Sequence, residues 1–333
     1  MATRENYLPD QPQWVELNLP RMLLTDTVQE LHTVIQNDWD PLRKSACQTA
    51  AGRALWKHVT RDPLADLLAG ERYLRSLHEK IRNDLLNNAR EISGVILAVR
   101  TLWFDSKLEE ALSSFSGETQ VVLLGAGMDT RAYRLSCLKE TIVFEVDFPD
   151  VLEVKTNLLE AAMELDDEHR HPVLAAKSLK KVPADIKSND WFQKLQVSGF
   201  VPEKSTVWIL EGILYYLSDS EAMQVLKIIA AKCCLAPTVL LADFMNKLST
   251  MMASSIFHFH SDWPDHLLPS IGFSHVKLSQ IGDPDADFGL MDDPLNMFNQ
   301  LRSLPRSTQT YPNDGKPCCR LYLVQASGFP NQT

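Results

Sequence analysis

Residues 121–135 read VVLLGAGMDTRAYRL, and this stretch decides the fold. Apolar residues typical of a buried strand run directly into Gly125-Ala126-Gly127, and a short polar stretch then leads into a helix-like tail. Closely spaced glycines let a backbone approach a ligand, and the start of a helix offers free N–H groups. The stretch predicts a nucleotide-type binding loop between a strand and a helix, although such a glycine pair also occurs in turns that bind nothing.

Asp147 strengthens this prediction because it ends the next apolar run, TIVFEVD (141–147). An acidic side chain at that place can accept hydrogen bonds from both hydroxyls of a ribose; the alternative is an N-cap before Phe148-Pro149. The loop lacks the G-x-G-x-x-G spacing of dinucleotide-binding proteins, and Asp129 at the helix start would repel a pyrophosphate. We therefore expect a nucleoside ligand without phosphates, of which S-adenosyl-L-methionine is the common one, and not NAD or FAD.

Short apolar runs alternate with helical stretches from residue 119 onward. Besides 119–125 and 141–147, such runs lie at 205–212, 238–244, 271–282 and 319–328. They are typical of strands in a mostly parallel sheet that is covered on both faces. The sequence therefore predicts an α/β fold with a doubly wound sheet.

The chain before this region has helical character. We expect an N-terminal arm at 1–20 and a helical cap with lead-in helices at 21–112, in which Asp62-Pro63 begins a helix over 62–86. The core is then 113–333, with an insertion on the substrate side around 245–270.

Composition excludes several classes of partner. The formal net charge is -10, which argues against a nucleic-acid partner. The first residues lack the apolar core of a signal peptide, and no apolar run reaches the roughly 18 residues that span a bilayer. The six cysteines form no C-x-x-C. We expect a cytoplasmic protein with reduced thiols and no membrane partner.

Taken together, these motifs resemble those of the leucine carboxyl methyltransferase family. The resemblance is carried by G-A-G-M-D-T-R-A-Y-R-L (125–135), F-E-V-D-F-P (144–149), S-A-C-Q-T-A-A-G-R-A (45–54), V-R-T-L-W-F-D (99–105), E-G-I-L-Y-Y-L (211–217) and I-G-D-P-D-A-D-F-G (281–289). It implies a seven-stranded, Rossmann-like class I methyltransferase sheet that uses S-adenosyl-L-methionine. The details are closer to the bacterial-type branch than to the branch that methylates the C-terminal leucine of a protein phosphatase.

The resemblance also assigns roles to individual residues. Gly125, Gly127, Asp147 and Glu211 match cofactor-binding positions of the family, with Asp147 at the ribose. Arg100 matches the arginine that holds the methionine carboxylate, where a guanidinium can form paired bonds.

The aromatic pair that follows Glu211 is assigned to the acceptor side. Tyr216 matches a tyrosine near the methyl acceptor, and we expect it to act in catalysis with Arg100. Its neighbour Tyr215 is expected to face away. Glu145, two residues before Asp147, is a weaker candidate for cofactor binding.

One departure from the family pattern concerns the adenine. The family carries an aspartate-leucine pair after the third strand, and Lys177-Ser178 falls at that place in PVLAAKSLKKV (172–182). Asp185 or Asp190 is the alternative acidic residue.

The segment FHFHSDWPDH (257–266) holds the remaining chemistry. His258 and His260 alternate, so they share a face of an extended chain and are candidates for contact with the substrate. Packed or solvated histidines are the alternative, and no further ligand signature predicts a metal.

These features favour an S-adenosyl-L-methionine-dependent O-methyltransferase that forms a methyl ester on a small-molecule carboxylate. Such an acceptor is ionised near neutral pH and needs no base. Three alternatives stay open: methylation of a protein's C-terminal leucine carboxylate, methylation of a hydroxyl with a histidine base, and a non-catalytic methyltransferase-like binding protein.

Overall fold

The computed structural model describes residues 16–164, 171–291, 293 and 295–330. Most of the predicted arm at 1–20 lies outside these residues. Residues 16–20 have no regular structure and lead into a short 3-10 helix, η1 (Arg21–Leu24).

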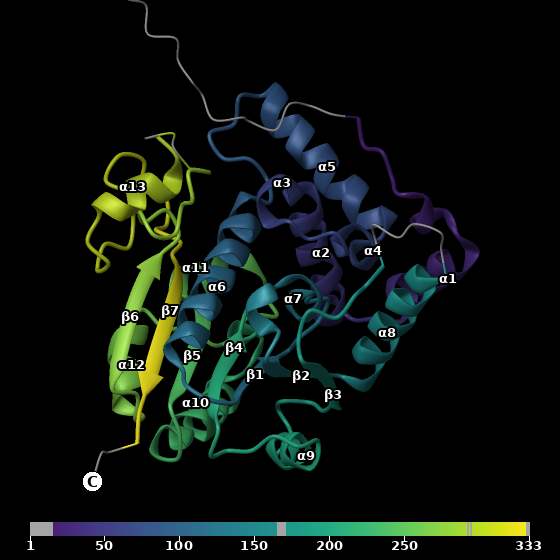
Figure 1. Ribbon diagram of the computed structural model, residues 1–333. Helices are drawn as coiled ribbons and strands as arrows, with labels where there is room; N and C mark the ends of the chain where they lie inside the picture. The colour runs from purple at the N-terminus through teal and green to yellow at the C-terminus, as the bar shows by residue number, and fades with distance from the viewer. Residues whose placement is uncertain (1–15, 165–170, 292, 294, 331–333) are drawn as a thin grey trace, which may run out of the picture.

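A seven-stranded sheet forms the centre of the molecule (Figure 1). Its strands are β1 (Thr119–Leu124), β2 (Thr141–Asp147), β3 (Ser178–Pro183), β4 (Ser205–Leu210), β5 (Thr238–Met245), β6 (His275–Gln280) and β7 (Leu321–Gly328). Their order is β3-β2-β1-β4-β5-β7-β6, and β7 runs antiparallel to both of its neighbours. This is the class I methyltransferase order, which confirms the predicted doubly wound sheet.

The strands form where they do because both faces of the sheet are buried. In β1 every residue is buried, and alternate side chains enter different cores. Val122 packs in a core with helix α10 (Asp219–Ala230), whereas Val121 packs in another with helix α6 (Val95–Ser114). Apolar runs without polar alternation are therefore what this sheet requires.

Helices make up the remaining layers. Besides α6 and α10, the α-helices of the described residues are α1 (Asp26–Asp38), α2 (Pro41–Leu55), α3 (Lys57–Thr60), α4 (Ala65–Ala69), α5 (Glu71–Leu86), α7 (Arg131–Arg134), α8 (Pro149–Met163), α9 (Trp191–Val197), α11 (Lys247–Ala253), α12 (Pro264–Ser270) and α13 (Met297–Ser303). Within the described part of the chain, no helix is long and apolar enough to cross a membrane.

Two predicted helices differ from the observed ones. The expected helix over 62–86 is divided into α4 and α5 by Gly70, which has a φ of 77° that breaks helical geometry. The helix after the glycine loop is the short α7, which begins only at Arg131.

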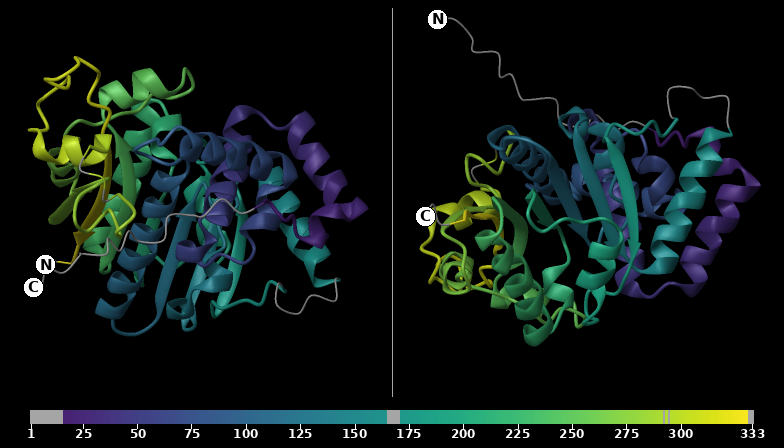
Figure 2. Two further views of the ribbon diagram at one scale, coloured as in Figure 1. Left: turned by 90° about the horizontal axis from the view of Figure 1, so that it is seen from above. Right: turned by 60° about the horizontal axis from the view of Figure 1, so that its bottom comes forward.

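The N-terminal helices pack over the ends of the strands. A third hydrophobic core joins α1, α2, α4 and α8, and it includes Met128 of the glycine loop. Figures 1 and 2 show α1, α2 and α4 in purple and blue and α8 in teal at the β2–β3 side, while the yellow C-terminal segment lies at the opposite edge. The helical region is thus packed directly against the loop that the sequence singled out.

A buried ion pair links β2 to the helix that follows it. Glu145 and Lys155 are almost fully buried, and Lys155 Nζ donates to Glu145 Oε1 over 2.7 Å. Glu145 Oε2 has no partner among the described residues. Burial raises the pKa of Glu145, and Lys155 partly opposes that shift. The pair is therefore structural, and Glu145 depends on Lys155.

We expect the Lys155→Met variant to lose about 3–5 kcal/mol of unfolding free energy, because it leaves an uncompensated carboxylate in the core. The double variant Glu145→Gln/Lys155→Met should lose much less. Urea unfolding of both variants measures the difference, and equal losses would contradict the dependence.

Candidate active site

A cavity opens where the carboxyl ends of β1, β2, β3 and β4 meet the N-terminal helices. Its empty volume is about 1060 Å³, part of which is open solvent. It lies where the strand order reverses, the usual ligand site of a doubly wound sheet. It is lined by Leu42, Arg43, Ser45, Ala46, Thr49, Arg53, Arg100, Leu123 to Asp129, Asp147, Phe148, Val151, Ala184 to Lys187, Ile209, Glu211 to Ile213, and Tyr215 to Leu217.

The glycine loop, residues 125–127, lines one side of this cavity. Gly125 and Gly127 have φ values of 68° and 47°, a region that favours glycine. A Cβ on Gly127 would lie 2.9 Å from Cβ of Ala46, and one on Gly125 would lie 2.8 Å from the side chain of Ile213. Both glycines are thus required by the backbone and by close packing on the opposite wall.

Asp147 closes the loop from β2. Its Oδ2 accepts from the Gly127 N–H over 2.6 Å, and its Oδ1 accepts from the Phe148 N–H over 2.7 Å. Burial raises its pKa to about 6, against the opposing effect of these two bonds. The carboxylate lines the cavity at the position that the sequence assigned to a ribose, whereas Glu145 does not line it.

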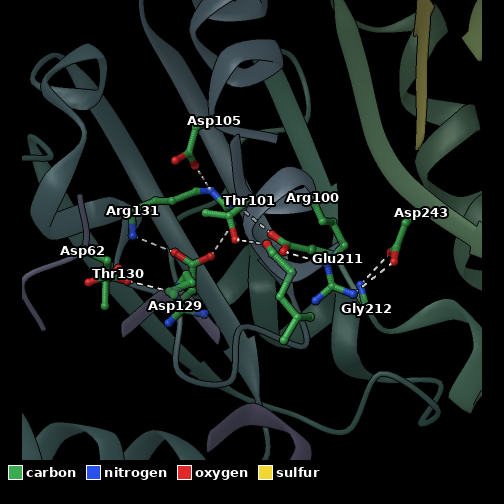
Figure 3. A network of polar contacts seen from close by, with 12 residues as sticks. Asp62, Arg100, Thr101, Asp105, Asp129, Thr130, Arg131, Glu211, Gly212 and Asp243 are labelled. Atoms are coloured by element: carbon green, nitrogen blue, oxygen red, sulfur yellow. Dashed lines mark hydrogen bonds and ion pairs between the residues drawn. The ribbon is translucent and has the colours of Figure 1, made fainter. Parts of the chain in front are cut away.

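A network of buried ion pairs lies next to the glycine loop (Figure 3). Glu211 accepts from Arg100 Nε over 3.0 Å and from Arg131 Nη2 over 2.7 Å. Arg100 Nη1 also donates to Asp243 Oδ2 over 3.3 Å. Burial alone would raise the pKa of Glu211, but the two arginines outweigh it and hold the pKa below its usual value. Glu211 is therefore an anion at neutral pH.

The aromatic pair after β4 is arranged differently from the prediction. Tyr215 does not face away: it lines the cavity, and Arg100 Nη1 donates to its hydroxyl over 3.3 Å. The reason is that the pair lies in a short 3-10 helix, η4 (Leu214–Tyr216), where neighbouring side chains do not alternate as in a strand. Tyr216 also lines the cavity, as does Ser45 of α2, and its ring packs on Phe257.

The predicted departure at Lys177-Ser178 is wrong. Ser178 begins β3, so these two residues lie at the amino end of the strand, away from the cavity. The residues after its carboxyl end are Ala184, Asp185 and Ile186, and all three line the cavity. Asp185 and Ile186 thus occupy the place of the family's aspartate-leucine pair, and Asp185 was the alternative that the sequence left open.

The two candidate histidines do not line the cavity. The His258 N–H donates to the Tyr215 carbonyl over 2.7 Å, and the Phe259 N–H donates to the Leu217 carbonyl over 3.0 Å. The backbone of residues 258 and 259 is therefore hydrogen-bonded to the backbone of residues 215 and 217. Among the residues that the structure describes, no group of His, Cys, Asp and Glu is placed to hold a metal ion.

Sequence reasoning missed three charged residues that shape the site. Arg53 and Arg131 are buried and contact the loop or Glu211, and Asp243 is fully buried behind Arg100. The available signal was a charged residue inside an apolar run, as in SACQTAAGRAL and TVLLADF. That signal says that a charge needs a partner, but it does not name the partner.

The model of the leucine carboxyl methyltransferase family matches residues 46–230, more than half of the chain. The chain belongs to the leucine carboxyl methyltransferase family. The match begins within α2 and ends with α10, so it includes the glycine loop and, of the α2 residues that line the cavity, Ala46, Thr49 and Arg53.

Similar proteins are found in actinobacteria. A Parafrankia sp. (strain EAN1pec) protein, named as a candidate S-adenosyl-L-methionine-dependent methyltransferase, is 40% identical over 136 residues, which cover 41% of this chain and 40% of that protein. A Mycobacteroides abscessus protein with the same description is 34% identical over 195 residues, covering 55% and 60%. The chain thus spans about half the length of the curated relatives it matches.

Among solved structures, a DUF574 family protein from Streptomyces avermitilis is 13% identical, with a TM-score of 0.48 over 79% of this chain and 94% of that chain. The strand order alone assigns the fold.

The raised pKa of Asp147 predicts a pH-dependent stability. In the folded, ligand-free protein this pKa is about 6, above the ordinary 3.8, so the folded state holds the proton more tightly. The resulting stabilisation is complete below pH 3.8 and is lost as the pH rises through about 6. Relative to Asp147→Asn, the wild-type unfolding free energy should fall by about 1–3 kcal/mol between pH 4 and pH 7. Denaturant unfolding at several pH values tests this, and a constant difference between the two proteins would contradict it.

Proposed function

We propose that the protein is an S-adenosyl-L-methionine-dependent O-methyltransferase whose acceptor is the carboxylate of a small molecule. The observation that carries the proposal is the composition of one cavity. A glycine loop, the carboxylate of Asp147 and the guanidinium of Arg100 line it together, and the chain belongs to a methyltransferase family.

The residues present fit the cofactor. Asp147 would accept bonds from the ribose hydroxyls, and Arg100 would bind the carboxylate of the methionine part. Phe148 and Ile186 line the same cavity as Asp185 and supply apolar side chains that suit a purine base. Asp129, whose pKa is about 2 because burial is outweighed by Arg131, supplies a permanent negative charge that suits an ammonium group and opposes a pyrophosphate.

When bound, S-adenosyl-L-methionine supplies a methyl group on a sulfonium. The chain's own part is to align an acceptor, to exclude water and to hold an anion in place. Tyr216 and Ser45 present hydroxyl groups at the cavity wall that suit a carboxylate.

Two features favour a carboxylate acceptor on a small molecule. No histidine is among the residues described as lining the cavity, and an ionised carboxylate needs no base. Helix α2 supplies one wall of the cavity, which favours a compact acceptor over the end of a protein chain. An acidic residue after β3, Asp185, lines the cavity, which favours a cofactor-binding enzyme over the alternative of a non-catalytic binding protein.

The first experiment is calorimetric titration with S-adenosylmethionine and S-adenosylhomocysteine. We expect micromolar binding by the wild type and binding weaker by about 1.5–3 kcal/mol, or about 10- to 150-fold, in Arg100→Ala, which loses a charged hydrogen bond.

Arg320→Ala is the matched control for this comparison. Arg320 is also a buried arginine, but it donates to Gln280 and to backbone carbonyls of the C-terminal segment, outside the cavity. If both variants keep wild-type affinity, Arg100 has no role in cofactor binding. If the wild type binds neither ligand at millimolar concentration, the proposed activity is wrong.

Tyr216→Phe tests the acceptor side. The variant should bind S-adenosylhomocysteine with nearly wild-type affinity, because the ring still packs on Phe257, while kcat for a carboxylic acid acceptor falls about 10- to 100-fold through the lost hydroxyl. The product should be a base-labile methyl ester, detected by release of volatile methanol. A base-stable ether product, abolished by replacing His258 or His260, would support a hydroxyl acceptor instead.

A further inference from the structure

Arg53 joins the N-terminal helices to the glycine loop. It lies on α2, is 8% exposed, and lines the cavity. Its Nη2 donates to the backbone carbonyl of Met128, the residue that follows Gly127, and its Nε donates to Asp62 Oδ2 over 2.8 Å. One guanidinium therefore spans a carboxylate of the helical region and a carbonyl of the loop.

Asp62 holds the loop at a second point. Its Oδ2 also accepts from the Thr130 hydroxyl over 2.6 Å, while its Oδ1 accepts from the Leu64 N–H over 3.2 Å. The side chain is fully buried, and its pKa is lowered because Arg53 and Arg134 outweigh the effect of burial. Asp62 is thus an ionised partner for Arg53 and Thr130.

Helix α2 touches the loop at a third point, where Ala46 lies against Gly127. Three residues of the N-terminal helical region, Ala46, Arg53 and Asp62, therefore hold residues 127–130 in place. On the side of the sheet, Asp147 accepts from the Gly127 N–H, and the Val146 carbonyl accepts from the Gly125 and Ala126 N–H groups.

We propose that Arg53 is a positioning residue for cofactor binding: through the Met128 carbonyl it holds the glycine loop in its ligand-binding conformation. This inference rests on the proposed function. Its physical basis is preorganisation, because a loop that is already ordered loses less freedom when a ligand binds. The N-terminal helices then determine cofactor affinity, besides forming a wall for the acceptor.

The loop can be examined without any ligand. Hydrogen exchange of a peptide covering 125–131 reports its order in the free protein. The test variant is Arg53→Met/Asp62→Asn, which removes both charges together and so leaves no unpaired charge in the core. Arg53→Lys is the conservative variant, since one ammonium cannot reproduce the fork that spans Asp62 and the Met128 carbonyl.

We expect faster exchange of 125–131 in the double variant and weaker binding of S-adenosylhomocysteine by about tenfold or more, with kcat at saturating cofactor changed much less. Arg53→Lys should fall between the double variant and the wild type. The control Arg320→Met should lower the melting temperature but leave both the exchange and the affinity unchanged.

The outcomes separate this inference from the proposed function. If the wild type binds but the double variant exchanges and binds like it, Arg53 does not position the loop. If Arg320→Met weakens binding as much as the double variant does, the effect is general destabilisation and the inference is wrong. If the wild type does not bind, the proposed function is wrong. Hydrogen exchange of 125–131 then still tests Arg53: faster exchange in the double variant than in the wild type means that Arg53 orders the loop, and unchanged exchange means that it does not. If the double variant does not fold, Arg53→Lys decides by the same two measurements.

Discussion

A continuous chain of buried ion pairs is the constraint on which the site depends. It runs from α2 across the glycine loop to β5, and Figure 3 shows most of its members. Its arginines are Arg53, Arg134, Arg131 and Arg100, and its carboxylates are Asp62, Asp105, Asp129, Glu211 and Asp243. Removing these charges from water is costly, and only mutual pairing offsets that cost. Their geometry is therefore held more firmly than that of ordinary surface groups.

This chain of charges explains how distant segments become one site. Arg131 contacts both Asp105 of α6 and Glu211 after β4. It therefore links α6, the helix before β1 in the chain, to the end of β4, the strand that pairs with β1. Arg100 continues the connection to Asp243 on β5. The members of this chain that line the cavity consequently have charges that are already compensated, and an incoming ligand need not reorganise them.

The same arrangement gives the helical region its place in the site. A doubly wound sheet provides a ligand crevice at its carboxyl edge, but an open crevice does not exclude water. Here α2 covers that edge, and the packing of Ala46 on Gly127 leaves no room for a larger residue in the loop. The loop and α2 must therefore fit each other, just as the loop must fit its ligand.

The sequence by itself determined the sheet, the glycine loop and the position of Asp147, because these depend on local patterns. An apolar run predicts a buried strand, and the loop and Asp147 lie at the ends of two such runs. The resemblance likewise located Arg100, Glu211 and Tyr216, all of which line the cavity. Only the tertiary structure placed Asp185 after β3 and turned Tyr215 toward Arg100, because both depend on where a strand ends. It alone paired Arg53 with the loop 75 positions away and Arg100 with Asp243 at a separation of 143. A local pattern indicates that a buried charge needs a partner, but the choice among distant partners is made by packing.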